Sequence, residues 1–99
     1  MKSSDILQNF LDEDNRVIQF PAKRKKKLYV LIYLAGKFEV EKEYTEKEVN
    51  ELLLKWHTFS DPATLRRELY DNRFLDRSRD GCVYRLAEKQ PTPQTLGLE

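Results

Sequence analysis

The chain has 99 residues, of which 39% are hydrophobic and 35% are charged, and its formal net charge at pH 7 is +1. A chain of this length forms one domain with a modest core and is too small for two. It has one cysteine, no apolar run near the roughly 20 residues of a membrane span and no signal-peptide pattern, so we expect a cytoplasmic protein without membrane contact.

Positive charge is concentrated in one stretch of the chain. Residues 16–27 carry six positive and no negative charges, whereas residues 1–15 carry one positive and four negative charges. The net charge of +1 therefore conceals a local basic segment, which predicts a basic patch on one surface.

The first predicted elements are a short helix and an extended segment. Ser3 and Ser4 are suited to cap a helix, which is followed by an acidic turn at residues 12–15. Residues 16–20 are β-branched and aromatic, which favours an extended segment that ends at Pro21. The apolar residues of the short helix are Ile6, Leu7, Phe10 and Leu11.

The next helix is predicted over residues 22–36. Its apolar residues cover most of the circumference in the second half, and Gly36 is a plausible C-cap. We therefore expect this helix to be central to the core. The apolar face is formed by Leu28, Leu31, Ile32 and Ala35, with Val30 and Leu34 beside it.

The clearest helix start in the sequence is the capping box of Thr45 and Glu48. It predicts a helix over residues 46–56, and Glu43-Tyr44 just before it is short enough to pair as a minimal strand. The expected buried stripe is Val49, Leu52, Leu53 and Trp56.

A further helix is predicted over residues 62–72. Asp61 is a good N-cap and Pro62 is a natural first helical residue. Leu65 and Leu69 face inward, so the two helices and the short turn between them form a helix–turn–helix. The side chains that face outward are Ala63, Thr64, Arg67, Tyr70 and Asp71, with Arg66 on the flank.

A β-hairpin is predicted next, because Asp80-Gly81 is typical of a two-residue turn in which both residues have positive φ. On one face this register pairs Arg79 with Cys82, Arg77 with Tyr84 and Leu75 with Leu86. On the other face Asp76 lies opposite Arg85, a favourable cross-strand charge pair. Residues 88–99 contain two prolines and one glycine without a packing pattern, so we expect a disordered tail.

These elements predict an α+β fold, namely a winged helix-turn-helix with an additional N-terminal helix and a short extended segment. Residues 1–87 form the domain and residues 88–99 the tail. Tyr33 and Trp56 are interpreted as core residues rather than stacking platforms. The predicted core is Leu28, Leu31, Ile32, Leu52, Leu53, Trp56, Leu65, Leu69 and Leu86.

The inventory of reactive residues argues against an enzyme. His57 is the only imidazole and Cys82 the only thiol, which are too few for a zinc site and give no reason to expect Cys–His catalysis. Three glycines do not form a phosphate-binding loop. We therefore expect no catalytic residues, no metal and no cofactor.

The basic segment favours a polyanionic partner. Lysine and arginine repel one another in the first turns of a helix and oppose its dipole, and bound phosphates would offset this repulsion. The outward face of helix 62–72 would approach bases, and the hairpin tip would reach the backbone or minor groove. The candidate nucleic-acid contacts are Lys23, Arg24, Lys25, Lys26 and Lys27; Thr64, Arg66, Arg67 and Tyr70; and Arg77 and Arg79.

Each of these features also has a purely structural interpretation. The lysine run is equally a solvated helix face, Arg67 can pair with Asp71 at i, i+4, and Arg77 can lie over Tyr84 as a cation–π pair. Asp71 and Glu68 oppose the binding of an anion to this helix.

Several blocks of the chain resemble the bacterial domain of unknown function numbered 2087, over roughly residues 5–86. The most specific blocks are Pro21-Ala-Lys-Arg-Lys25 and Tyr44-Thr-Glu-Lys-Glu-Val-Asn50, together with residues 6–11, 31–35, 64–70, 74–77 and 84–85. The resemblance implies a module of bacterial transcriptional regulators that binds nucleic acid. In a regulator with a separate DNA-binding domain, it equally implies the sensing or dimerising half.

The leading hypothesis is therefore a DNA-binding module of a bacterial transcriptional regulator. The alternative is a protein-interaction, dimerisation or sensing module that keeps the winged-helix shape without touching DNA. RNA is a further candidate partner, because contacts to phosphate do not distinguish the two polymers.

Overall fold

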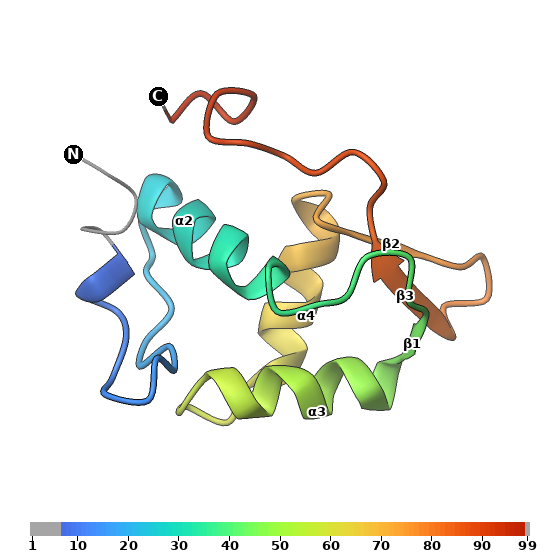
Figure 1. Cartoon of the computed structure of the whole chain (residues 1–99), viewed down its shortest axis with the longest axis horizontal. Coiled ribbons are helices and arrows are strands. Elements are labelled where there is room, and N and C mark those ends of the chain that lie inside the picture. The colour runs from blue at the N-terminus through green and yellow to red at the C-terminus, as the bar shows by residue number, and fades with distance from the viewer. Residues whose placement is uncertain (1–6, 99) are drawn as a thin grey trace.

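The computed structural model describes residues 7–98 (Figure 1). Its elements in chain order are α2 (Arg24–Ala35), β1 (Tyr44–Thr45), α3 (Glu46–Trp56), α4 (Pro62–Asp71), β2 (Leu75–Arg77) and β3 (Val83–Leu86). Leu7 and Gln8 are helical, whereas the expected cap at Ser3 and Ser4 lies outside the described residues. No helix in the described part of the chain is both long enough and apolar enough to span a membrane.

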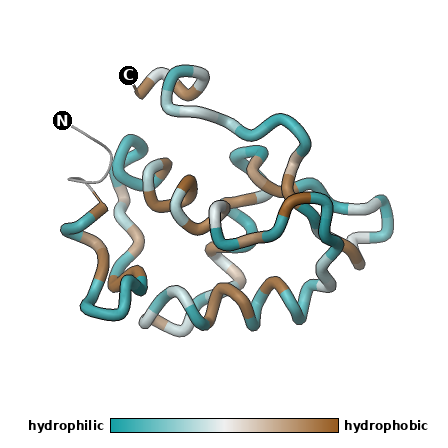
Figure 2. The backbone as a smooth tube through the Cα atoms, in the orientation of Figure 1, coloured by the Kyte–Doolittle hydropathy of each residue, from teal (hydrophilic) through white to brown (hydrophobic). Residues whose placement is uncertain are grey.

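Helix α2 lies at the centre of the core, as predicted, and is two residues shorter at its start and one at its end than expected. Leu28, Val30 and Leu31 are at most 1% exposed, and Tyr29 and Leu34 are buried as well. Figure 2 shows the same change along the helix, from a hydrophilic first turn to apolar residues in the interior. The N-cap is Lys23, whose side chain makes no capping hydrogen bond.

Helix α3 begins at the predicted capping box. The N–H of Glu48 donates to Oγ1 of Thr45 at 3.1 Å, and Oε1 of Glu48 accepts from the N–H of Thr45 at 2.9 Å. These hydrogen bonds, with that from the backbone of Thr45 foremost, hold the pKa of Glu48 below its ordinary value. Tyr44, just before the N-cap, and Val49, the fourth residue of the helix, occupy the two positions of a hydrophobic staple, and both are buried.

Helix α4 is capped at both ends, but the sequence pattern predicted only the N-terminal cap. Asp61 caps the N-terminus by accepting from the N–H of Thr64 at 3.3 Å. At the other end Arg73 adopts a φ of 68°, its N–H donates to Tyr70, and the N–H of Phe74 donates to the carbonyl of Leu69 at 2.8 Å. This is a Schellman motif with arginine in the position usually taken by glycine.

The three strands form one antiparallel sheet in the order β1-β3-β2. Three of the predicted hairpin pairs are confirmed, since Leu75 pairs with Leu86, Asp76 with Arg85 and Arg77 with Tyr84. The predicted pair of Arg79 and Cys82 is wrong, because both residues lie in the connection between β2 and β3. The minimal strand β1 lies one residue later than expected, so that Tyr44 pairs with Tyr84 and Thr45 with Val83.

The prediction of a two-residue turn with positive φ at both Asp80 and Gly81 is wrong. Gly81 has a positive φ of 76°, but Asp80 does not, and the N–H of Gly81 donates to the carbonyl of Ser78. The hydroxyl of Ser78 accepts from the N–H of Val83, and the carboxylate of Asp80 accepts from the N–H of Cys82. These side chains satisfy the backbone donors, so the connection is longer, and Cys82 is exposed in it rather than lying inside a strand.

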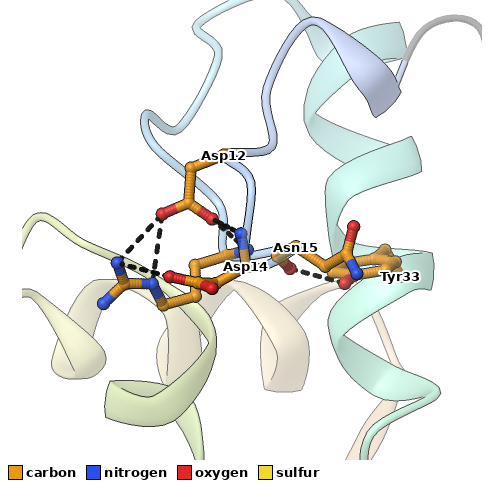
Figure 3. Close-up of polar contacts among 5 residues, drawn as sticks. Asp12, Asp14, Asn15 and Tyr33 are labelled. Atoms are coloured by element: carbon orange, nitrogen blue, oxygen red, sulfur yellow. Dashed lines mark hydrogen bonds and ion pairs between the residues drawn. The ribbon is translucent and has the colours of Figure 1, made fainter.

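The N-terminal segment is held against α2 and the turn after α3. Asp12 accepts from the N–H groups of Asp14 and Arg16 at 2.9 and 2.8 Å, and the second of these bonds is the main cause that lowers the pKa of Asp12 (Figure 3). The hydroxyl of Tyr33 donates to the carbonyl of Asn15 at 2.6 Å. This contact joins the loop to α2.

The extended segment that follows is also confirmed in outline. Val17 is fully buried and forms isolated bridges, antiparallel to Leu11 and parallel to His57. Its N–H donates to the carbonyl of Trp56 at 2.7 Å, and its carbonyl accepts from Thr58 at 3.0 Å. The segment therefore covers the turn between α3 and α4.

The predicted core is correct in its centre and incomplete at its edges. Leu28, Leu31, Leu53, Leu65 and Leu69 are at most 1% exposed. Other predicted members pack against this cluster but are only partly buried, namely Ile32, Leu52, Trp56 and Leu86. Buried residues that the predicted list omitted include Phe10, Val17, Tyr29, Val30, Leu34, Val49, Phe74, Leu75 and Tyr84.

The expectation of a disordered tail over residues 88–99 needs correction, because residues 90–98 make packing contacts and hydrogen bonds with the domain. Leu96 and Leu98 pack partly against the core, and the amide of Gln90 donates to the carbonyls of Phe74 and Ala87 at 2.9 and 2.8 Å. The contact between Gln90 and Phe74 spans 16 positions, and the core that Leu96 and Leu98 meet is formed by earlier elements, so no local pattern indicated this packing.

Candidate nucleic-acid interface

The exposed face of α4 is defined by what the helix buries. Leu65 and Leu69 are fully buried, and a helix advances 100° per residue, so the opposite face must point outward. Arg67 lies in the middle of this outward face. The other exposed residues of the face are Ala63, Thr64, Tyr70 and Asp71, as predicted.

Arg66 is held by α3 and does not stand free on this face. One Nη donates to Oδ1 of Asn50, and the other lies 3.4 Å from Oε1 of Glu46. The Arg66 side chain is only 18% exposed. The prediction that Arg66 approaches bases is therefore disfavoured, and its position indicates that it fixes α4 against α3.

Lys27 and Glu68 form an ion pair across α2 and α4, with Nζ 3.4 Å from Oε1. Both side chains are less than 30% exposed, and Nζ also lies 5.5 Å from the centre of the Phe20 ring. This pair removes Lys27 from the set of freely available cations. It also compensates Glu68, which was one of the two carboxylates that opposed an anionic partner.

Tyr70 and Arg77 connect α4 to the hairpin. The guanidinium carbon of Arg77 lies 4.7 Å from the centre of the Tyr70 ring, a cation–π contact. The ring that Arg77 covers is therefore that of Tyr70 and not that of Tyr84. A hydrogen bond to Tyr84 raises the pKa of Arg77, a residue type that is always protonated in proteins.

The hairpin connection carries a second arginine. Arg79 is exposed next to Asp80, whose carboxylate accepts hydrogen bonds from Ser78 at 2.6 Å and from the N–H of Cys82 at 3.0 Å. Hydrogen bonding, chiefly from Ser78, lowers the pKa of Asp80. The connection is thus internally bonded while the cation of Arg79 points to solvent.

The basic start of α2 is the most exposed part of the lysine run. No acidic residue lies in the first turn of the helix. Lys23, Lys25 and Lys26 are exposed, and the structure gives them no ion pair within the described residues. Arg24 donates from Nη2 to the carbonyl of Leu96 at 3.2 Å. Like charges thus remain uncompensated at the positive end of a helix dipole.

The structure brings some of the predicted residues together and separates others. The outward face of α4 and the hairpin are joined by the contact between Tyr70 and Arg77. Figure 1 shows the start of α2 and the hairpin toward opposite ends of the molecule, with α4 between them. The predicted contacts therefore form two basic groups rather than one continuous patch.

Two features near these groups differ from the sequence expectations. The suggested pair of Arg67 and Asp71 is absent from the ion pairs of residues 7–98, so Arg67 is not neutralised on its own helix face. Lys37, which no sequence pattern singled out, lies with its Nζ 4.0 Å from the ring centre of Trp56 and 4.5 Å from that of Tyr33. Both aromatic residues are partly buried, and their contact is a T-shaped one.

A metal centre is not formed by the described residues. Among residues 7–98, no three His, Cys, Asp or Glu side chains are grouped in a way that could hold a metal ion. His57 is used internally: its Nε2 accepts from the N–H of Asp61 at 2.9 Å, and its Nδ1 lies 2.5 Å from the carbonyl of Leu53.

Comparison with known proteins gives a family and no characterised relative. Residues 16–86 match the family described as "Uncharacterized protein conserved in bacteria (DUF2087)". The comparisons found no match among curated proteins and none among solved structures.

Proposed function

The chain belongs to this bacterial family, DUF2087, and we propose that it is a DNA-binding module of a transcriptional regulator with the architecture of a winged helix. The order of elements supports this architecture. A core helix is followed by a strand, two helices and a hairpin, and the early strand β1 pairs with β3 of the hairpin. In such a fold α4 is the helix that enters the major groove, and the hairpin is the wing.

The observation that carries the proposal is the position of Arg67. It stands exposed in the middle of the outward face of α4, while Arg66 on one flank is bonded to α3 and Glu68 on the other is paired with Lys27. An arginine in this place is free to donate two hydrogen bonds to the O6 and N7 atoms of guanine. Thr64 and Tyr70 complete the surface that would face bases.

The remaining cations are suited to hold the DNA backbone. Arg77 and Arg79 project from the hairpin beside α4, and Lys23, Lys25 and Lys26 stand at the start of α2. The longest dimension of the molecule is 39 Å, which equals about 11 base pairs of B-DNA. The two basic groups lie toward opposite ends of the molecule (Figure 1), so they would contact phosphates separated by up to about one helical turn.

The first test measures how binding to random duplex DNA depends on salt. Each lysine–phosphate contact contributes about −0.9 to the slope of log K against log salt. We expect Lys25→Gln with Lys26→Gln to flatten the slope by up to about 1.8. Lys27 is left unchanged in this variant because its ammonium is paired with Glu68.

The matched control is Lys47→Gln with Lys55→Gln, which removes the same charge from exposed positions of α3. This control is expected to change the slope by much less than the variant in α2. Equal slopes for both variants would show that the basic start of α2 makes no specific contribution. If neither DNA nor RNA is bound at about 50 mM salt, the nucleic-acid proposal is wrong, and the alternative of a protein-interaction or sensing module replaces it.

A second test concerns base recognition by α4. Arg67→Ala is expected to weaken binding to duplexes selected from a random pool by about 1–3 kcal/mol and to weaken binding to random duplex much less. Arg79→Ala, a change in the hairpin connection, should weaken both by similar factors because phosphates carry no sequence information. The same loss on selected and random duplexes for Arg67→Ala would contradict a role in reading bases.

A further inference from the structure

The segment after β3 folds back along α2 instead of leaving the domain (Figure 1). We call residues 88–98 the strap. Its beginning is anchored by Gln90, whose side-chain amide donates to the carbonyls of Phe74 and Ala87. The strap then passes the end of α2, where Pro91 lines a crevice of about 270 Å³ together with Ile32 and other residues.

The second half of the strap is an internally bonded turn. The N–H of Leu96 donates to the carbonyl of Thr92 at 2.9 Å, and the N–H of Leu98 donates to the carbonyl of Pro93 at 2.7 Å. The hydroxyls of Thr92 and Thr95 bond each other, and each also bonds the backbone of the other threonine. These local hydrogen bonds hold the turn in the shape in which it contacts α2.

This turn meets the start of α2 in the middle of the proposed phosphate contacts. The carbonyl of Leu96 accepts from Nη2 of Arg24 at 3.2 Å, and Leu96 and Leu98 pack partly against the core. Lys25 lies on the same side of α2 as Ile32, because the two are seven residues, or nearly two turns, apart. The strap thus follows the side of α2 that carries Arg24 and Lys25.

We propose that the strap is an autoinhibitory element that competes with nucleic-acid phosphates for the basic start of α2. This inference rests on the proposed function. While Nη2 of Arg24 donates to the carbonyl of Leu96, that donor is not available to a phosphate. A phosphate offers a stronger, charge-assisted hydrogen bond than a neutral carbonyl. Since Leu96 and Leu98 are only partly buried, a polyanion can displace the strap.

The test compares the full chain with a chain that ends at residue 87, using random duplex DNA at about 50 mM salt. Releasing one hydrogen bond and two partly buried leucines is expected to tighten binding by about tenfold. Thermal melts of both chains show whether the shortened chain is folded. Because the shortened chain loses the anchor of Gln90 as well, a second variant keeps the full length.

This second variant is Leu96→Asn with Leu98→Asn, and its control is Leu54→Asn, a leucine on α3 that is 48% exposed. We expect tighter duplex binding for the strap variant and unchanged binding for the control. In the unaltered chain, saturating duplex should also accelerate hydrogen exchange at the amides of Leu96 and Leu98, which are bonded within the strap.

The outcomes separate the two proposals. Duplex binding that is equally tight with and without the strap, together with unchanged exchange at these amides, overturns autoinhibition and leaves DNA binding in place. If neither the full nor the shortened chain binds duplex, the proposed function fails and the autoinhibitory role fails with it. Binding by the shortened chain alone would support both.

Discussion

Replacing Leu31 or Leu69 by alanine is expected to lower the free energy of unfolding by about 2–5 kcal/mol. Both side chains are fully buried, Leu31 in the central helix α2 and Leu69 on the inner face of α4. Each substitution removes apolar contact and leaves a cavity that close-packed neighbours fill only in part. A loss of this size is a large share of the about 5–15 kcal/mol that stabilises a typical domain.

Urea unfolding followed by circular dichroism measures this effect. Leu54→Ala, at a leucine 48% exposed on α3, is the control and should change stability by no more than about 0.5 kcal/mol. Unchanged midpoints for Leu31→Ala and Leu69→Ala would mean that the core does not lie between α2 and α4.

The second large effect is expected at His57, which is 3% exposed in the turn between α3 and α4. Since Nε2 accepts from the N–H of Asp61, the ring proton must reside on Nδ1, which donates to the carbonyl of Leu53. The imidazole thereby joins the end of α3 to the N-cap of α4. Val17 covers this turn by its bridge to His57, and Phe59 stacks edge-on at 4.7 Å.

His57→Ala is expected to cost about 2–4 kcal/mol, because one donor and one acceptor lose their partner in a place that water reaches poorly. His57→Gln should recover part of the loss, since its Oε1 atom replaces Nε2 as an acceptor for the N–H of Asp61. Lys55→Ala, an exposed change two residues earlier, is the control. If His57→Ala unfolds at the same urea concentration as the unaltered chain, the imidazole does not connect the two helices.

Within the candidate site, sequence reasoning identified the residue types but not their partners. Arg67, Arg79 and the exposed lysines of α2 stand at the surface, where the patterns of their own segments had put them. Arg66 lies on the flank of this helix face by spacing, and it is bonded to Glu46 and Asn50 of α3. Helical periodicity gives the direction of a side chain and says nothing about which neighbouring helix will meet it.

What the sequence by itself determined is local. Two of these features are the capping box of Thr45 and Glu48 and the N-cap at Asp61, which depend on residues three positions apart. The third is the hairpin register, which depends on one short continuous segment. All three can therefore be predicted without knowledge of the fold. The apolar density of α2 likewise required burial on most of its faces. These signals were sufficient to predict a mixed α+β domain with three helices followed by a hairpin.

The contacts between segments that are distant in the sequence were decided only by the tertiary structure. Glu68 neutralises Lys27 from 41 positions away, and Leu96 meets Arg24 across 72 positions. Arg73 closes α4 with a positive φ because burial of Phe74 stabilises the motif that glycine usually provides. Such contacts depend on how whole elements pack, and packing energy is summed over the core rather than encoded in any one stretch of sequence.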